Sequence, residues 1–142
     1  MYKQDTFKVT ALSKEQCDIT NSYQVRELIG DSKYDCIINA AAYTNVDQAE
    51  ENYALSKLVN CESVKNISQC IKQSQTLFIH FSTDYVFDGD SKRPYRETDR
   101  ANPVNAYGKS KYEGENIIKS SGIPSLISTQ VVGVTRFLSF TK

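Results

Sequence analysis

The stretch from Thr76 to Gly89 reads TLFIHFSTDYVFDG, an apolar run that ends in hydroxyl and carboxylate side chains. A short apolar run of this kind is typical of a strand buried in a parallel sheet. The polar residues from Ser82 to Asp84 therefore stand at the carboxyl end of that strand, where open parallel sheets bind their ligands. His80 is the single histidine and lies inside the strand, so we interpret it as a structural residue with satisfied polar atoms.

Strand-like and helix-like segments alternate on both sides of this run. Their apolar spacing predicts further strands at 7–12, 34–39 and 123–127, and helices at 23–29, 54–67 and 106–121. Asn105 and Gly122 are the residue types expected at the two ends of the last helix. Residues 88–105 are polar and predict a loop. The alternation indicates an α/β fold with a parallel sheet covered on both faces.

Length and charge restrict the class of protein. The 142 residues make about one domain, and 17 basic residues balance 17 acidic ones. Without a basic field, nucleic acid and anionic membranes are not expected as partners. No apolar run is long enough to span a bilayer and no signal-peptide core opens the chain, so we expect a cytoplasmic protein. The cysteines lack metal-site spacing, so we expect no metal and reduced thiols at Cys17, Cys36, Cys61 and Cys70.

Tyr107 and Lys111 form the second chemical feature of the sequence. They stand four residues apart in the predicted helix 106–121, so both side chains emerge on one face. A nearby ammonium favours the phenolate and lowers the pKa of a tyrosine. With the Thr83 hydroxyl facing them, they would form a proton-transfer site of the kind that reduction of a sugar ketone requires. A packed tyrosine and a solvated lysine would also fit the spacing.

Five sequence blocks resemble the extended short-chain dehydrogenase/reductases, and most closely the dTDP-4-dehydrorhamnose reductases. In family order they are CDIT at 17–20, INAAAYTNVDQAE at 38–50, STDYVFDG at 82–89, PYRETD at 94–99 and NAYGKSK at 105–111. The second and third blocks are the specific ones, because chance often produces a lone Tyr-x-x-x-Lys. The resemblance implies a Rossmann-like, doubly wound sheet. It also implies a reductase that transfers a hydride from NAD(P)H to the 4-keto group of a dTDP-deoxysugar, in dTDP-L-rhamnose biosynthesis.

The resemblance implies a role for each matching residue. Tyr107 would protonate the developing alkoxide, and Thr83 would hydrogen-bond to the same oxygen. Asp84 would lie beside the substrate, and Lys111 would hold the nicotinamide ribose. Tyr107 and Lys111 are thus expected to be both catalytic and cofactor-binding. Small side chains allow a cofactor to approach the backbone closely, and the remaining cofactor contacts are expected from Asp18, Ile19, Ala41, Ala42 and Tyr43.

Ser13 and Lys14 follow the first predicted strand, where the family often has an acidic residue for the ribose hydroxyls. Serine and lysine tolerate or attract a ribose phosphate, which favours NADP over NAD. The expected partner is a nucleotide-sugar substrate, and the resemblance allows a homodimer of the full-length protein. Two other functions stay open. One is a sugar-nucleotide epimerase or dehydratase with the same Tyr and Lys, and the other is a non-catalytic subunit resembling the regulatory subunit of methionine adenosyltransferase.

Two departures from the family pattern limit the expected activity. The six glycines form no Gly-x-x-Gly-x-x-Gly and only six residues precede Phe7, so we expect this sequence to lack the first strand and the glycine-rich phosphate loop. Residues 134–142 match no family segment, so we also expect it to lack the substrate domain. We therefore expect residues 1–133 to be a partial NAD(P)-binding domain followed by an unmatched tail. Such a chain would be an inactive or truncated fragment.

Overall fold

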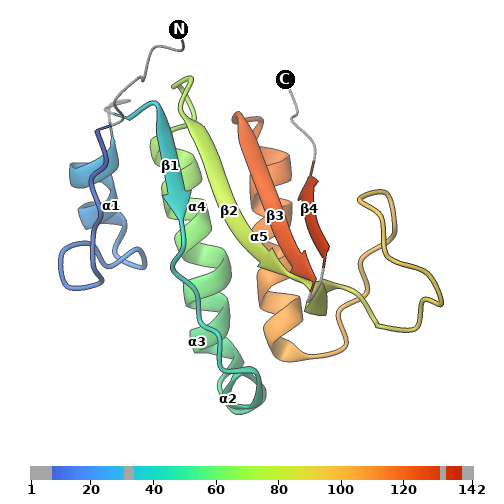
Figure 1. Ribbon diagram of the computed structural model, residues 1–142. Helices are drawn as coiled ribbons and strands as arrows, with labels where there is room; N and C mark the ends of the chain where they lie inside the picture. Colours follow the sequence, from blue (N-terminus) through green and yellow to red (C-terminus); the bar gives the residue numbers. More distant parts are fainter. Residues whose placement is uncertain (1–7, 31–33, 132–133, 139–142) are drawn as a thin grey trace, which may run out of the picture.

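The computed structural model of the chain describes residues 8–30, 34–131 and 134–138 (Figure 1). Its sheet has the strand order β1-β2-β3-β4. The first three strands run parallel, and β4 pairs antiparallel with β3. The bounds are Cys36–Asn39 for β1, Leu77–Thr83 for β2, Ser125–Val131 for β3 and Val134–Leu138 for β4. The α/β fold with a parallel sheet is confirmed, and β4 occupies part of the segment that the sequence left unmatched.

The helices cover one face of this sheet. In Figure 1, α3, α4 and α5 lie behind the strands, and α1 lies on the flank of α4. A π-helical turn, η1, joins α3 to α4, and a 3-10 turn, η2, follows β2. The bounds are Ser22–Ile29 (α1), Val46–Glu51 (α2), Tyr53–Lys57 (α3), Leu58–Glu62 (η1), Ser63–Cys70 (α4), Asp84–Val86 (η2) and Ala106–Ser121 (α5).

The apolar core lies between these helices and the sheet. Phe78 of β2 is fully buried there, together with residues of α1, α4, α5 and β3 such as Val25, Val64 and Ile118. On the opposite face, Ile38 is 61% exposed and Phe81 is 47% exposed. In the described residues the prediction of a sheet covered on both faces is therefore wrong. Strand order β1-β2-β3 moves in one direction, and right-handed crossovers then place every connecting helix on the same side.

The strand predicted at 7–12 does not form either. Residues 8–12 are without regular structure, Val9 is 82% exposed, and Phe7 lies outside the described residues. Within the described chain no strand pairs with the outer edge of β1. A strand needs a neighbour for its backbone hydrogen bonds, so an alternating pattern alone does not produce one.

The predicted helix ends are confirmed by their caps. The Asn105 side chain accepts a hydrogen bond from the Gly108 amide at 2.7 Å, and Gly122 takes the left-handed conformation that ends α5. Asn21 caps α1 in the same way, through the amides of Tyr23 and Gln24. The helix predicted at 54–67 is present but is interrupted by the π turn η1.

Helix α5 approaches its neighbours closely because two of its glycines face backbone atoms. A Cβ on Gly114 would lie 2.3 Å from the Asn60 carbonyl oxygen of η1. A Cβ on Gly108 would lie 2.1 Å from the Tyr85 carbonyl oxygen of η2. Both distances are shorter than any normal contact, so these glycines determine how closely the helix packs.

We predict that Gly114→Ala lowers the free energy of unfolding by about 1–3 kcal/mol, because α5 must move away from η1. This loss has to exceed the gain of about 1 kcal/mol that alanine brings to a helix interior. The measurement is urea-induced unfolding. The matched control is Asn116→Ala, an exposed position of the same helix, which should change stability by less than about 0.5 kcal/mol. An equal response of both variants would contradict the close approach.

Candidate active site

Most of the predicted site residues lie where the parallel strands end. Asn39, the last residue of β1, is in register with His80 of β2, and Thr83 ends β2. The helix α5 starts at the same edge of the sheet (Figure 1). Open parallel sheets bind their ligands at this edge.

Thr83 and Tyr107 meet at this edge. The half-buried Tyr107 phenol lies beside the buried Thr83 hydroxyl, close enough for that hydroxyl to lower the pKa of the phenol. The Thr83 hydroxyl also donates to the Asp84 carboxylate at 3.2 Å and accepts from the Tyr85 amide at 3.3 Å. The Tyr85 ring packs edge-on against the Tyr107 ring, with centroids 5.8 Å apart. These contacts hold the phenol beside a strand-end hydroxyl, which is the juxtaposition that the sequence predicted.

The pKa of Tyr107 moves in the direction opposite to the prediction. Burial raises the pKa of Tyr107, the neighbouring Thr83 hydroxyl opposes this, and the charge of Asp84 adds to the rise. We expected the Lys111 ammonium to lower the pKa of Tyr107, but it is not among the groups that do so. Its ammonium instead donates to the backbone carbonyl of Phe81. The phenol therefore carries its proton throughout the neutral pH range.

Lys111 is a buried charge. It is 2% exposed, which rules out the solvated lysine that its spacing alone allowed. Burial lowers its pKa to about 8, and the Glu115 carboxylate one helical turn away partly opposes this shift. Glu115 is buried too, and it accepts hydrogen bonds from the Ser82 hydroxyl and from Lys119, the latter at 2.8 Å. Lys111 is thus charged at neutral pH, but it loses its proton more readily than a lysine in water does.

Asn60 of the π turn η1 fixes the segment that follows β1, and the sequence analysis missed it. Its Oδ1 accepts from the Tyr43 amide at 2.8 Å, and its Nδ2 donates to the Tyr43 carbonyl at 3.0 Å. The same Nδ2 donates to the Ser110 hydroxyl at 2.9 Å, and Ser110 donates to the Tyr107 carbonyl at 2.7 Å. The one signal for Asn60 in the sequence was that a polar residue interrupts the apolar pattern of the predicted helix 54–67.

Glu50 of α2, also missed, fixes the start of α5. Its Oε1 accepts from the Ala106 amide at 2.7 Å, immediately before Tyr107. A carboxylate is favourable at this position because the first amides of a helix carry partial positive charge. The contact joins residues 56 positions apart, so no local pattern could reveal it.

The predicted cofactor-side residues lie in two places. Ala41 is exposed after β1, with its amide donating to the Asn39 side chain at 3.1 Å, and Ala42 and Tyr43 follow it half-buried. Asp18 lies before α1 and accepts from the Thr20 amide and hydroxyl at 2.9 and 2.7 Å. These bonds lower the pKa of Asp18, with a smaller contribution from the charge of Lys14. Ile19 is half-buried and packs against the core.

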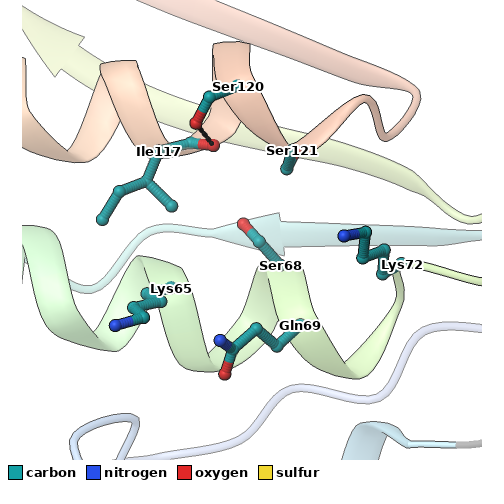
Figure 2. A pocket seen from close by; sticks show the side chains of 7 residues that line it. All are labelled: Lys65, Ser68, Gln69, Lys72, Ile117, Ser120 and Ser121. Carbon is teal, nitrogen blue, oxygen red and sulfur yellow. Dashed lines mark hydrogen bonds between the residues drawn. The ribbon is translucent and has the colours of Figure 1, made fainter.

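The cavity in Figure 2 does not belong to this site. It has a volume of about 220 Å³ and lies between α4 and the last turns of α5, at the opposite end of that helix from Tyr107. Lys65, Lys72 and Ile117 are among the residues that line it. In the figure the Lys65 ammonium points away from the space between the helices.

All four cysteines are free thiols. In the part of the chain that the structure describes, no helix has both the length and the apolar character needed to cross a membrane.

Residues 1–131 match the family described as the RmlD substrate binding domain. The chain belongs to this family. It is 44% identical over 115 residues to a dTDP-4-dehydrorhamnose reductase from Burkholderia thailandensis, which covers 81% of this chain and 39% of the relative. The chain spans about two fifths of the length of the curated relatives it matches.

Two solved structures show the same RmlD-family fold. A dTDP-4-dehydrorhamnose reductase from Clostridium acetobutylicum superposes with a TM-score of 0.85 at 36% identity, over 91% of this chain and 46% of that one. The enzyme from Bacillus anthracis, solved in complex with NADP, superposes with a TM-score of 0.84 at 33% identity, over 90% of this chain and 46% of that one. The partial Rossmann-like fold and the resemblance to the dTDP-4-dehydrorhamnose reductases are both confirmed.

We predict that Lys111→Met raises the free energy of unfolding by about 1–3 kcal/mol at neutral pH. This range already subtracts the stabilisation lost with the hydrogen bond to the Phe81 carbonyl. Below about pH 8 the Lys111 ammonium is charged in both the folded and the unfolded chain, so the full cost of burying the charge opposes folding. Between about 8 and the ordinary 10.5 the unfolded chain holds a proton that the folded chain has lost. The gain should therefore shrink through this window as the pH rises.

Urea-induced unfolding at several pH values measures this effect. The control is Lys72→Met, because Lys72 is exposed and its replacement should change stability by less than about 0.5 kcal/mol at every pH. A Lys111→Met variant that is less stable than the unchanged chain at neutral pH would show that the buried ammonium is not a cost to folding.

Proposed function

We propose that this chain carries the cofactor-binding part of an NADPH-dependent reductase that acts on a dTDP-4-keto-6-deoxysugar. The observation that carries the proposal is the pairing of the Tyr107 phenol with the strand-end hydroxyl of Thr83, with the buried Lys111 ammonium on the same helix. The names of the relatives and the NADP in the Bacillus anthracis structure support it. The proposal places residues 1–133 in the NAD(P)-binding domain of a cytoplasmic enzyme, with a homodimer as its full-length assembly.

The proposed chemistry uses Tyr107 as the acid. Its raised pKa keeps the phenol protonated at neutral pH, so it can give its proton to the oxygen of a ketone as that carbon is reduced. If the Thr83 hydroxyl turns its single proton from the Asp84 carboxylate to the same oxygen, it stabilises the developing negative charge. The half-buried Asp84 would lie beside the sugar. NADPH, when bound, supplies the hydride.

The residues at the end of β1 suit a dinucleotide. Ala40 and Ala41 are small and exposed, so a ligand can approach their backbone, and Ala42 and Tyr43 would continue that contact. Asp18 and Ile19 would lie on the adenine side. Lys14 lies close enough to Asp18 to influence its pKa, and its charge would suit the ribose phosphate of NADP. Lys111 would hold the nicotinamide ribose.

The names of the relatives favour reduction over the epimerase and dehydratase reactions, which would use the same Tyr and Lys. A non-catalytic binding subunit would bind the dinucleotide without turnover. Oxidation of NADPH by a keto-sugar nucleotide is therefore the observation that separates the reductase from both alternatives.

We predict that Tyr107→Phe lowers turnover by about 10²–10⁴-fold, because it removes the proton donor and keeps the ring. The assay uses a chimera in which the segment of this chain that matches the Burkholderia thailandensis reductase replaces the corresponding segment of that enzyme. NADPH oxidation is followed with a dTDP-4-keto-6-deoxysugar, and the KM for NADPH should stay unchanged. Thr83→Val should lower turnover with little change in cofactor affinity.

The matched control is Tyr112→Phe, one helical turn after Gly108, where the ring lies under the Lys119 ammonium. This variant should turn over like the parent chimera. Near-normal turnover of Tyr107→Phe would contradict the role of the phenol, and an inactive parent chimera that still binds NADPH would favour the binding subunit.

A second prediction concerns the choice between NADPH and NADH. Lys14→Glu replaces an attractive charge by a repulsive one, and two charges at contact distance in water interact by about 1 kcal/mol. The dissociation constant of NADPH in the chimera should therefore rise on the order of 10-fold, with that of NADH unchanged. Lys92→Glu in the exposed loop 88–105 makes the same charge change elsewhere and should affect neither. Equal weakening of both cofactors would show that Lys14 does not face the ribose phosphate.

A further inference from the structure

His80 is a buried histidine to which the proposed reaction gives no task. It is 1% exposed and lies on the covered face of β2. Its Nδ1 lies 3.2 Å from the Nδ2 of Asn39, but its Nε2 is buried and has no hydrogen-bond partner among the described residues. The expectation of a fully satisfied structural histidine is therefore correct for one ring nitrogen only.

The neighbouring bonds determine which ring nitrogen carries the proton. The Ala41 amide is a donor, so the Asn39 atom that it contacts at 3.1 Å is the carboxamide oxygen. The Asn39 NH₂ group then faces His80, and it can only donate. The Nδ1 of His80 must be the acceptor, so the proton of the neutral ring sits on Nε2. One chain of bonds thus runs from His80 through Asn39 to the backbone of Ala41.

The charges around the ring favour this neutral form. Burial, together with the ammonium of Lys111 on α5, lowers the pKa of His80 to about 3. Glu115 acts on Lys111, and its carboxylate is engaged by Ser82 and Lys119. The ring therefore stays neutral at neutral pH, and Nδ1 stays available as an acceptor.

We propose that His80 is a positioning residue: its Nδ1 holds the Asn39 carboxamide so that the backbone at Ala41 keeps the conformation in which it meets the dinucleotide. Asn39 holds the start of this segment and Asn60 holds Tyr43 at its end. The role at the cofactor rests on the proposed function. The bond chain itself does not depend on that function.

The unpartnered Nε2 supports this assignment. A leucine or phenylalanine would fill the same place in the core without burying a polar donor that nothing accepts, and such a donor costs free energy. Core packing alone therefore does not explain a histidine here. The acceptor at Nδ1 is what an apolar side chain could not supply.

The first test is a nitrogen-15 NMR measurement on the 142-residue chain, in which the ring signals need no assignment because His80 is the single histidine. We expect the neutral ring to carry its proton on Nε2. A ring protonated on Nδ1 would overturn the proposal. Asn39→Asp replaces the donor by a carboxylate oxygen, so the proton should move to Nδ1 or the pKa of the ring should rise. An unchanged ring in Asn39→Asp would also overturn it.

The second test compares two replacements of the histidine. His80→Asn places a carboxamide oxygen near the position of Nδ1, whereas His80→Leu fills the space without an acceptor. Hydrogen exchange of the Ala41 amide, measured relative to the Phe78 amide in the core, should accelerate on the order of tenfold in His80→Leu, the equivalent of one lost hydrogen bond. The His80→Asn variant should restore slow exchange, and equal exchange in both variants would contradict the proposal.

Two features keep this proposal separate from the proposed function. All these measurements are made without cofactor or substrate. A chimera that neither binds nor oxidises NADPH would count against the reductase and leave the bond chain intact. If His80→Leu does not fold, the tautomer of His80 in the unchanged chain and its response to Asn39→Asp still decide whether the proposal holds.

Discussion

One buried carboxamide, that of Asn60, connects the two halves of the candidate site. It hydrogen-bonds to both backbone groups of Tyr43, in the segment after β1, and to the Ser110 hydroxyl on the helix that carries Tyr107. Its own backbone carbonyl is the surface against which Gly114 packs. The distance between the segment after β1 and the helix α5 is therefore determined by one residue of a π-helical turn. Such turns insert one residue into a helix and are frequent at functional sites.

A second constraint is the charge that this fold buries. Lys111 is covered by the helix–sheet interface, and a buried ammonium is tolerated only with polar partners. The Phe81 carbonyl supplies one partner and Glu115 supplies an opposite charge. Glu115 in turn needs Ser82 and Lys119. One buried lysine thus accounts for three further polar side chains of β2 and α5, namely Ser82, Glu115 and Lys119.

The sequence predicts best what depends on neighbours along the chain. The caps Asn105 and Gly122 and the strand-end hydroxyl of Thr83 are local features, and each lies where its pattern placed it. The direction of the Tyr107 pKa was wrong, because spacing reveals that two residues share a helix face but not how deeply that face is buried.

Features that depend on distant partners could not be predicted in this way. Glu50 and Ala106 meet across 56 residues, and the π turn that directs Asn60 leaves no mark in the apolar spacing. The segment 7–12 has the alternation of a strand, but the described residues 8–12 have no neighbouring strand to pair with. Its outcome was decided by tertiary context rather than by propensity.

The strand order explains why one face of the sheet is open. It also explains why both members of the Thr83–Tyr107 pair come together within this chain. Right-handed crossovers in one direction bring every helix to one face and every strand-to-helix turn to one edge. The pair needs only β2, η2 and α5, and all three are joined by contacts within this chain. Ile38 and Phe81 are exposed on the other face, yet the Phe81 carbonyl, which lies in the sheet backbone, still receives Lys111. The Thr83–Tyr107 pair is therefore built entirely from the covered side of the sheet. This is how it can be present in a chain that spans about two fifths of its curated relatives.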